Sequence, residues 1–179
     1  MPLPAVLVVA AAVSLVAAAA FILTVRREPA VRALYEKLPR ERISGTVLGA
    51  VALIWCIPNI RPIFMPDSPF QMFVVPLILL AIVLAAIFLN YLFARAFAAI
   101  LILGAHAVLK AAYPAQLPGY PVLAALVLLA GVIGIVISAK PYWLRDWFRL
   151  SFRMPAVRWT SAAYFLLLCA MSCYCAVEA

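Results

Sequence analysis

The chain has 179 residues, of which 69% are hydrophobic and 11% charged, and its mean hydropathy is +1.17. A soluble domain is roughly half apolar and about a quarter charged, so it could not hide this much apolar surface from water. The formal charge of +8 does not indicate nucleic acid, because the basic residues lie in short clusters between apolar runs and no nucleic-acid-binding motif accompanies them. The composition therefore indicates an integral membrane protein whose first partner is the lipid bilayer.

Six apolar segments come close to the length of about 20 residues that a membrane-spanning helix needs. In chain order, the predicted spans are residues 3–25, 45–60, 70–89, 95–112, 122–139 and 159–176. The third and fourth would be about 66 Å long as one helix, roughly twice the hydrocarbon thickness, so we expect a tight turn between Asn90 and Ala94. The predicted fold is an all-α integral membrane protein, a single transmembrane domain over residues 1–179 with about six transmembrane helices.

A short amphipathic helix is predicted at residues 29–38, in the first polar connection. Val31, Tyr35 and Leu38 recur at helical spacing, and charged residues occupy the opposite face. Pro39 stops this helix. The pattern is typical of a helix that lies in the membrane interface.

A second interfacial helix is predicted at residues 141–154. Trp147 shares an apolar face with other large side chains, while Arg145, Arg149 and Arg153 line another face. A basic, aromatic-rich helix in the headgroup plane attracts anionic lipids, so these three arginines are candidate headgroup contacts. Two interpretations stay open for both interfacial helices: simple topology anchors, or a docking face for a cytoplasmic partner or a specific lipid headgroup.

Basic residues predict the orientation of the chain. All 14 Lys and Arg residues except Arg61 and Lys110 lie in alternate connections, which the positive-inside rule assigns to the cytoplasm. Both termini are then outside. The compact chain without eukaryotic sorting signals points to a bacterial cytoplasmic (inner) membrane.

The first apolar segment has a competing interpretation as a cleaved signal peptide, with Ala17 to Ala20 as a small-residue cleavage site. The preceding residues carry no positive charge, and the apolar run is longer than a signal core. Cleavage would also place residues 26–42 outside, against the charge rule. We therefore expect the segment to be a transmembrane helix.

Polar residues inside the spans are the first place to look for function, because each costs free energy in lipid. Arg95 and Lys110 lie near the two ends of the fourth span, where their side chains can reach headgroups. His106 lies about 16 Å along the helix from Arg95. We expect it to hydrogen-bond a neighbouring helix; a proton, ion or cofactor role is the alternative.

A break in the second span favours a transporter or channel as the alternative function. Pro58 frees a backbone carbonyl near the outer boundary, and Arg61 lies three residues further on. Discontinuous helices line substrate sites in transporters, and the candidate functional polar residues are His106, Arg61, Arg95 and Asn90. A helix that simply ends in an exposed loop explains the break equally well.

Four cysteines raise the possibility of a membrane thiol or redox enzyme, which is a weaker alternative. Cys169 and Cys173 share a helix face, whereas Cys175 points elsewhere, and Cys56 would join them if the second and sixth spans were neighbours. Cysteines in apolar helices are more often small packing residues. The sequence therefore predicts neither a metal site nor a cofactor.

Small residues at helical spacing predict close helix contacts. Gly45 and Gly49 open the second span, and Gly134 and Ser138 form a stripe on the fifth. Such stripes pack within the bundle, with a second copy in a homo-oligomer, or with other membrane subunits.

No carboxylate lies inside any predicted span, and no catalytic motif is present. Abundant packing surface with little polar chemistry indicates a small polytopic protein that is not an enzyme. The function expected from the sequence is a non-catalytic accessory or scaffold component of a membrane assembly.

Overall fold

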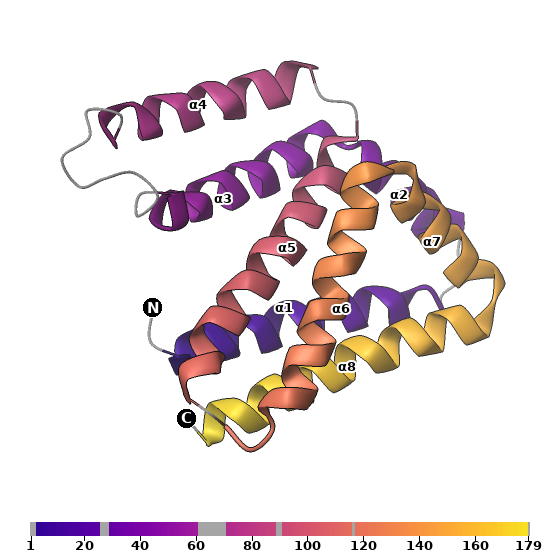
Figure 1. The fold of residues 1–179 in the computed structure, drawn as a ribbon. Helices are drawn as coiled ribbons and strands as arrows, with labels where there is room; N and C mark the ends of the chain where they lie inside the picture. Colours follow the sequence, from indigo (N-terminus) through magenta and orange to yellow (C-terminus); the bar gives the residue numbers. More distant parts are fainter. Residues whose placement is uncertain (1–2, 26–28, 61–70, 89–90, 116, 179) are drawn as a thin grey trace.

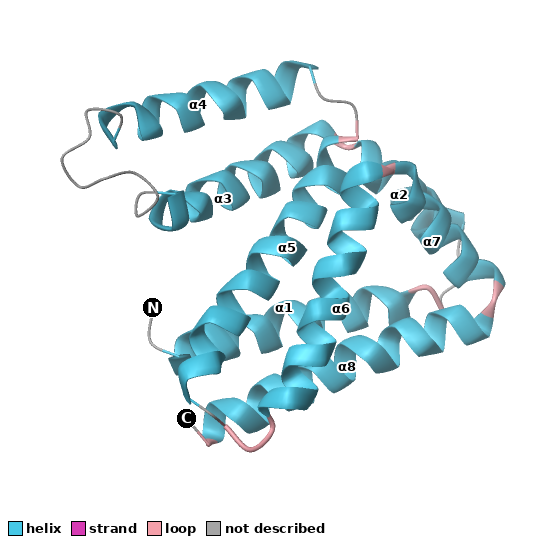
Figure 2. Cartoon of the chain, viewed as in Figure 1, coloured by secondary structure: helices cyan, strands magenta, loops and turns pink. Residues whose placement is uncertain are grey.

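The structure is a computed structural model that describes residues 3–25, 29–60, 71–88, 91–115 and 117–178. All regular structure in these residues is helical, as the sequence predicts (Figure 2). The elements, in chain order, are α1 (Leu3–Leu23), α2 (Pro29–Lys37), the 3₁₀ turn η1 (Leu38–Arg40), α3 (Arg42–Ile60), α4 (Gln71–Phe88), α5 (Leu92–Ala112), the 3₁₀ turn η3 (Tyr113–Ala115), α6 (Tyr120–Ala139), α7 (Tyr142–Arg153) and α8 (Pro155–Val177).

Four of these helices are long and apolar enough to cross a membrane: α1, α5 extended to Ala115, α6 and α8. The apolar helical stretches at Arg42–Ile57 and Met72–Ala85, in α3 and α4, are shorter. In the four long helices only 28% to 39% of the apolar window is buried, so most of their apolar side chains face outward. A bilayer accommodates such surfaces, so the all-helical structure is consistent with the predicted helical membrane protein, with four helices of membrane-spanning length where the sequence predicts six spans.

The helices form two layers around an angled hairpin (Figure 1). Helices α1 and α8 run antiparallel side by side, and the α5–α6 hairpin packs across them. Helix α3 packs on α5, and α4 packs on the far side of α3. The start of α1 and the end of α8 lie at one end of the molecule, whereas α2 and α7 lie at the opposite end (Figure 1).

Aromatic packing holds the end of the bundle that carries α2 and α7. The Phe21 ring on α1 lies 4.9 Å from Trp147, 5.7 Å from Phe148 and 5.8 Å from Phe165, measured between ring centroids. This cluster joins α1, α7 and α8. A second buried cluster at the other end joins α1, α5, α6 and α8 through Leu7, Val108, Leu123, Leu168 and their neighbours.

Two glycines allow the closest helix contacts. A Cβ atom on Gly45 of α3 would lie 2.5 Å from the backbone nitrogen of Phe93 on α5. A Cβ atom on Gly134 of α6 would lie 2.9 Å from the backbone oxygen of Ala98 on α5. Both distances are shorter than real Cβ contacts, so α5 is clamped between two helices that approach it through glycine.

Helix α5 begins earlier than the sequence predicts, at Leu92 instead of Arg95. Tyr91 precedes it with φ 58°, in the left-handed region that non-glycine residues seldom adopt. The turn therefore ends at Tyr91, and the helix already includes residues as far as Ala94 that the sequence assigns to the turn. Similarly, α8 begins at Pro155 instead of Trp159, because proline suits the first position of a helix.

Candidate functional site

Helices α2 and α7 pack against each other through Tyr35. Its ring meets those of Phe148 and Phe152 edge to face, at centroid distances of 5.1 and 5.5 Å. Its hydroxyl donates a hydrogen bond of 2.6 Å to the Ala20 carbonyl at the end of α1. Burial raises the pKa of Tyr35. These contacts fix α2 and α7 to each other and to the bundle.

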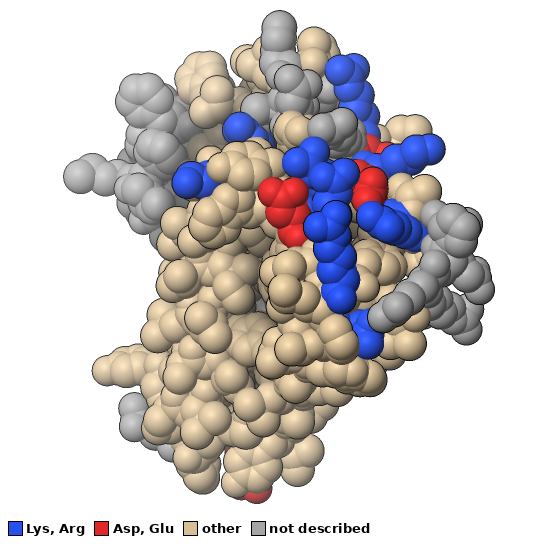
Figure 3. All heavy atoms as spheres, turned by 90° about the vertical axis from the view of Figure 1, so that its right-hand side faces the viewer, with Lys and Arg blue, Asp and Glu red and all other residues tan. Residues whose placement is uncertain are grey.

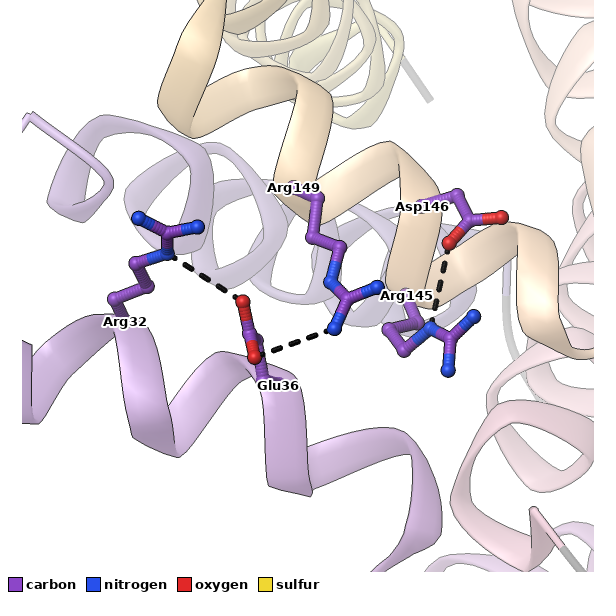
Figure 4. A network of polar contacts seen from close by, with 5 residues as sticks. All are labelled: Arg32, Glu36, Arg145, Asp146 and Arg149. Atoms are coloured by element: carbon purple, nitrogen blue, oxygen red, sulfur yellow. Dashed lines mark hydrogen bonds and ion pairs between the residues drawn. The ribbon is translucent and has the colours of Figure 1, made fainter.

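Charged side chains gather over this pair of helices (Figure 3). Glu36 accepts a hydrogen bond from Arg32 on one carboxylate oxygen and from Arg149 on the other, each at 3.4 Å (Figure 4). Arg145 pairs with Asp146 at 3.3 Å. The contact between Glu36 and Arg149 joins residues 113 positions apart, which no sequence pattern indicates.

An open pocket of about 450 Å³ lies beside this network. Its lining side chains, three cationic and two anionic together with an alanine, are Ala33, Glu36, Lys37, Glu41, Arg145 and Arg149. We call it the α2–α7 pocket. It brings Arg145 and Arg149 together, while Arg153, the third predicted headgroup contact, is exposed and does not line it.

Arginine contacts lower the pKa of Glu36, chiefly through the hydrogen bond from Arg149. A carboxylate with a lowered pKa stabilises the folded state above its ordinary pKa of 4.5, and this contribution is lost as the pH falls through the lower value. We therefore expect amides of α2 to exchange with deuterium faster at pH 3 than at pH 6, once the intrinsic pH dependence of exchange is corrected for. The Glu36→Gln variant should show a smaller difference; an equal difference would contradict the role of the carboxylate.

The apolar side of α7 is divided between the bundle and the outside. Trp147 is partly buried and donates from its ring nitrogen to the Ser161 hydroxyl at 3.1 Å. Trp143, Leu150 and Met154 are exposed. This exposed face suits the lipid boundary, where amphipathic helices lie in the headgroup plane.

The hydrogen bond predicted from His106 to a neighbouring helix is not formed with any helix of the described part of the chain. The His106 side chain is exposed on α5 instead of facing a neighbouring helix. Arg95 and Lys110 are exposed as well, and the helical repeat places all three on the same side of α5. We call these residues the polar face of α5. Asn90 and Arg61, the other two candidate polar residues, lie outside the described residues.

The cysteines do not form one cluster. Cys56 lies on α3, which packs on α4 and α5, whereas Cys169, Cys173 and Cys175 lie on α8, which packs on α1. All four are free thiols. Within the described residues, no group of three or more His, Cys, Asp or Glu side chains is placed to hold a metal ion.

Among the predicted packing residues, Gly45 and Gly134 lie at close helix contacts. Gly49 faces α5 with more room, since a Cβ atom there would lie 3.7 Å from the Ala96 side chain. Ser138 is exposed near the end of α6, so the predicted stripe does not extend to it.

Sequence reasoning missed the burial of Arg158 in the first turn of α8. Its side chain is 8% exposed, its guanidinium lies 5.6 Å from the Trp159 ring centroid, and its Nε has no hydrogen-bond partner among the described residues. The sequence pattern could have indicated this burial, because Arg158 lies at helical spacing from the buried residues Ser161, Ala162 and Phe165.

Comparison with known proteins finds no match: no family model, no curated protein and no solved structure resembles the chain significantly. The fold and composition nevertheless define its class. It is a helical membrane protein with four helices of membrane-spanning length and a charged pair of helices at one end of the bundle.

Proposed function

We propose that the protein is a non-catalytic accessory subunit of a larger membrane assembly, and that a partner subunit covers the polar face of α5. In this proposal α3 and α4 also cross the membrane, which gives six spans. The α2–α7 end is cytoplasmic, both termini are outside, and the membrane is the bacterial inner membrane.

The exposure of His106 is the observation that carries the proposal. His106 is about 21 Å along α5 from Leu92 and about 9 Å from Ala112, so it lies within the hydrocarbon region if α5 crosses the bilayer. Ionisable side chains at such depths rarely face lipid; they face other protein segments or water-filled cavities. The imidazole therefore favours a protein neighbour over lipid at this face.

The chemistry of this neighbour follows from the sequence. A hydrogen-bond acceptor, best a carboxylate, would satisfy both His106 and the adjacent Lys110. The chain has no Asp or Glu inside its predicted spans, so a second copy cannot offer one at this depth. We therefore infer a different membrane protein that carries an Asp or Glu in a spanning helix.

The position of the charged residues supports the proposed orientation, in which the α2–α7 end is cytoplasmic. The network around Glu36 and Arg149 lies at the end of the bundle that carries α2 and α7, as positive-inside topology requires of a cytoplasmic surface (Figure 3). Exposed apolar residues on α4, such as Met72 at 78% and Leu77 at 65%, also favour its placement in lipid.

Affinity purification from native membranes in a mild detergent tests the proposal. We expect a second membrane protein to co-purify in a fixed ratio, and the double variant His106→Leu/Lys110→Leu to lose most of it. Lys140→Gln is the matched control, because it removes an exposed basic residue at the end of α6 and should retain the partner. Recovery of the wild-type chain as a monomer with lipid only would refute the proposal.

A further inference from the structure

The α2–α7 pocket differs from a simple basic patch because carboxylates form part of its wall. Glu36 and Glu41 line it together with three cationic side chains. A site for a plain anion would not place a carboxylate against its ligand, because like charges at short range repel. The pocket instead has the charge pattern of a zwitterion binding site.

Ion pairs within the network show which charges are left for a ligand. Glu36 is neutralised by Arg32 and Arg149. Arg145 pairs with Asp146. Within the described residues, one lining cation and one lining anion have no ion pair: Lys37 and Glu41. Glu41 accepts a hydrogen bond from the Ser44 hydroxyl at 3.4 Å, a neutral donor.

Hydrogen-bond donors are also in surplus on the basic side of the pocket. An arginine has five N–H donors, and each of Arg145 and Arg149 uses a single nitrogen in its ion pair. The other N–H groups of these two side chains, with the Lys37 ammonium, suit a phosphate group. The Glu41 carboxylate suits an ammonium group that can donate hydrogen bonds.

Apolar surface next to the pocket favours a lipid as the source of this zwitterion. Ile43 and Val47 at the start of α3 are 80% and 62% exposed, and they follow Glu41 within a few residues. Val51 and Ile54 continue the exposed stripe along α3. Acyl chains of a lipid whose headgroup occupies the pocket can therefore lie along α3.

We propose that the α2–α7 pocket binds a phosphoethanolamine headgroup, with its phosphate at Lys37, Arg145 and Arg149 and its ammonium at Glu41. The expected ligand is a phosphatidylethanolamine lipid of the surrounding leaflet. This inference does not rest on the proposed partner subunit, since no residue of α5 lines the pocket.

Native mass spectrometry of the full chain in detergent tests the proposal with chain-matched phosphatidylethanolamine, phosphatidylcholine and phosphatidylglycerol. The trimethylammonium of phosphatidylcholine cannot donate a hydrogen bond to Glu41. One charge-assisted hydrogen bond corresponds to about a tenfold difference in affinity, so wild type should favour phosphatidylethanolamine over phosphatidylcholine by about that factor. Glu41→Gln should bring the ratio near one and increase phosphatidylglycerol binding.

Two further variants separate the roles of the charges. Lys37→Gln should weaken binding of all three lipids, because each carries the phosphate, whereas Arg153→Gln, on α7 but outside the pocket, should change none. Displacement of bound lipid by free phosphoethanolamine would support the headgroup chemistry and assign the site to a soluble ligand; retention of the lipid would support the membrane source. Equal wild-type binding of the ethanolamine and choline lipids, or a Glu41→Gln variant with an unchanged ratio, would overturn the proposal.

Discussion

Replacement of Phe21 by alanine should lower the free energy of unfolding by about 3–5 kcal/mol, the usual cost of removing a large buried aromatic side chain. Phe21 is 3% exposed and its ring contacts aromatic rings on both α7 and α8. Its loss leaves a cavity at the junction of three helices, and the rigid aromatic neighbours limit collapse into it. Thermal or denaturant unfolding in detergent micelles measures the change.

Phe73→Ala on α4 is the matched control for this prediction. Phe73 is 59% exposed, so the same truncation there removes little protein contact. We expect its unfolding midpoint to lie close to that of wild type. If the two variants were equally stable, the aromatic cluster would not hold the α7 end of the bundle.

The second large effect is expected at Gly45. A methyl group at this position would meet the backbone of Phe93 at 2.5 Å, and backbone atoms cannot move aside as a flexible side chain can. Gly45→Ala should therefore push α3 away from α5 and destabilise the fold by about 1–3 kcal/mol, a typical cost of overpacking. The unfolding midpoint in detergent reports this loss.

Gly104→Ala is the control, because this replacement is expected to leave the stability unchanged or to raise it. Gly104 lies inside α5, and a Cβ atom there would meet nothing within 4 Å. Alanine favours helix over glycine by about 1 kcal/mol, so this variant should be as stable as wild type or more so. Destabilisation by Gly104→Ala and tolerance of Gly45→Ala would contradict the described packing of α5.

The helices themselves could be predicted because each is a long apolar run bounded by charge or proline. Hydropathy counts residues in such runs, so it finds the central parts of α1, α6 and α8. It is less sensitive to helix ends, and α5 begins at Leu92 because Tyr91 adopts a left-handed conformation that no composition rule requires.

The side of α5 on which His106 lies could have been inferred from the positions of the alanines in that helix, instead of from the polarity of His106. On α5 the buried face consists largely of small residues, among them Ala94, Ala98, Ala105 and Ala112, because close helix contacts require them. His106 is not on that face. A lone polar residue in an apolar helix does not show by itself which way its side chain points, so the sequence could not predict that His106 faces away from the other helices of the chain.

The α2–α7 pocket could be predicted only in part. Basic residues of α7 were candidates from their spacing, and the amphipathic pattern predicted both helices, α2 and α7. The pairing of Glu36 with Arg149 depends on the tertiary arrangement of α1 and α8, which brings two distant connections to one end of the bundle. A single sequence does not contain that information.

Photo-crosslinking from position 106 in native membranes tests the central claim, that a protein neighbour covers the polar face of α5. A photoreactive amino acid in place of His106 should yield a product larger by the mass of one discrete partner protein. The same group in place of Leu128, an exposed apolar residue of α6, should crosslink mainly to lipid. Lipid adducts alone from position 106 would contradict the account.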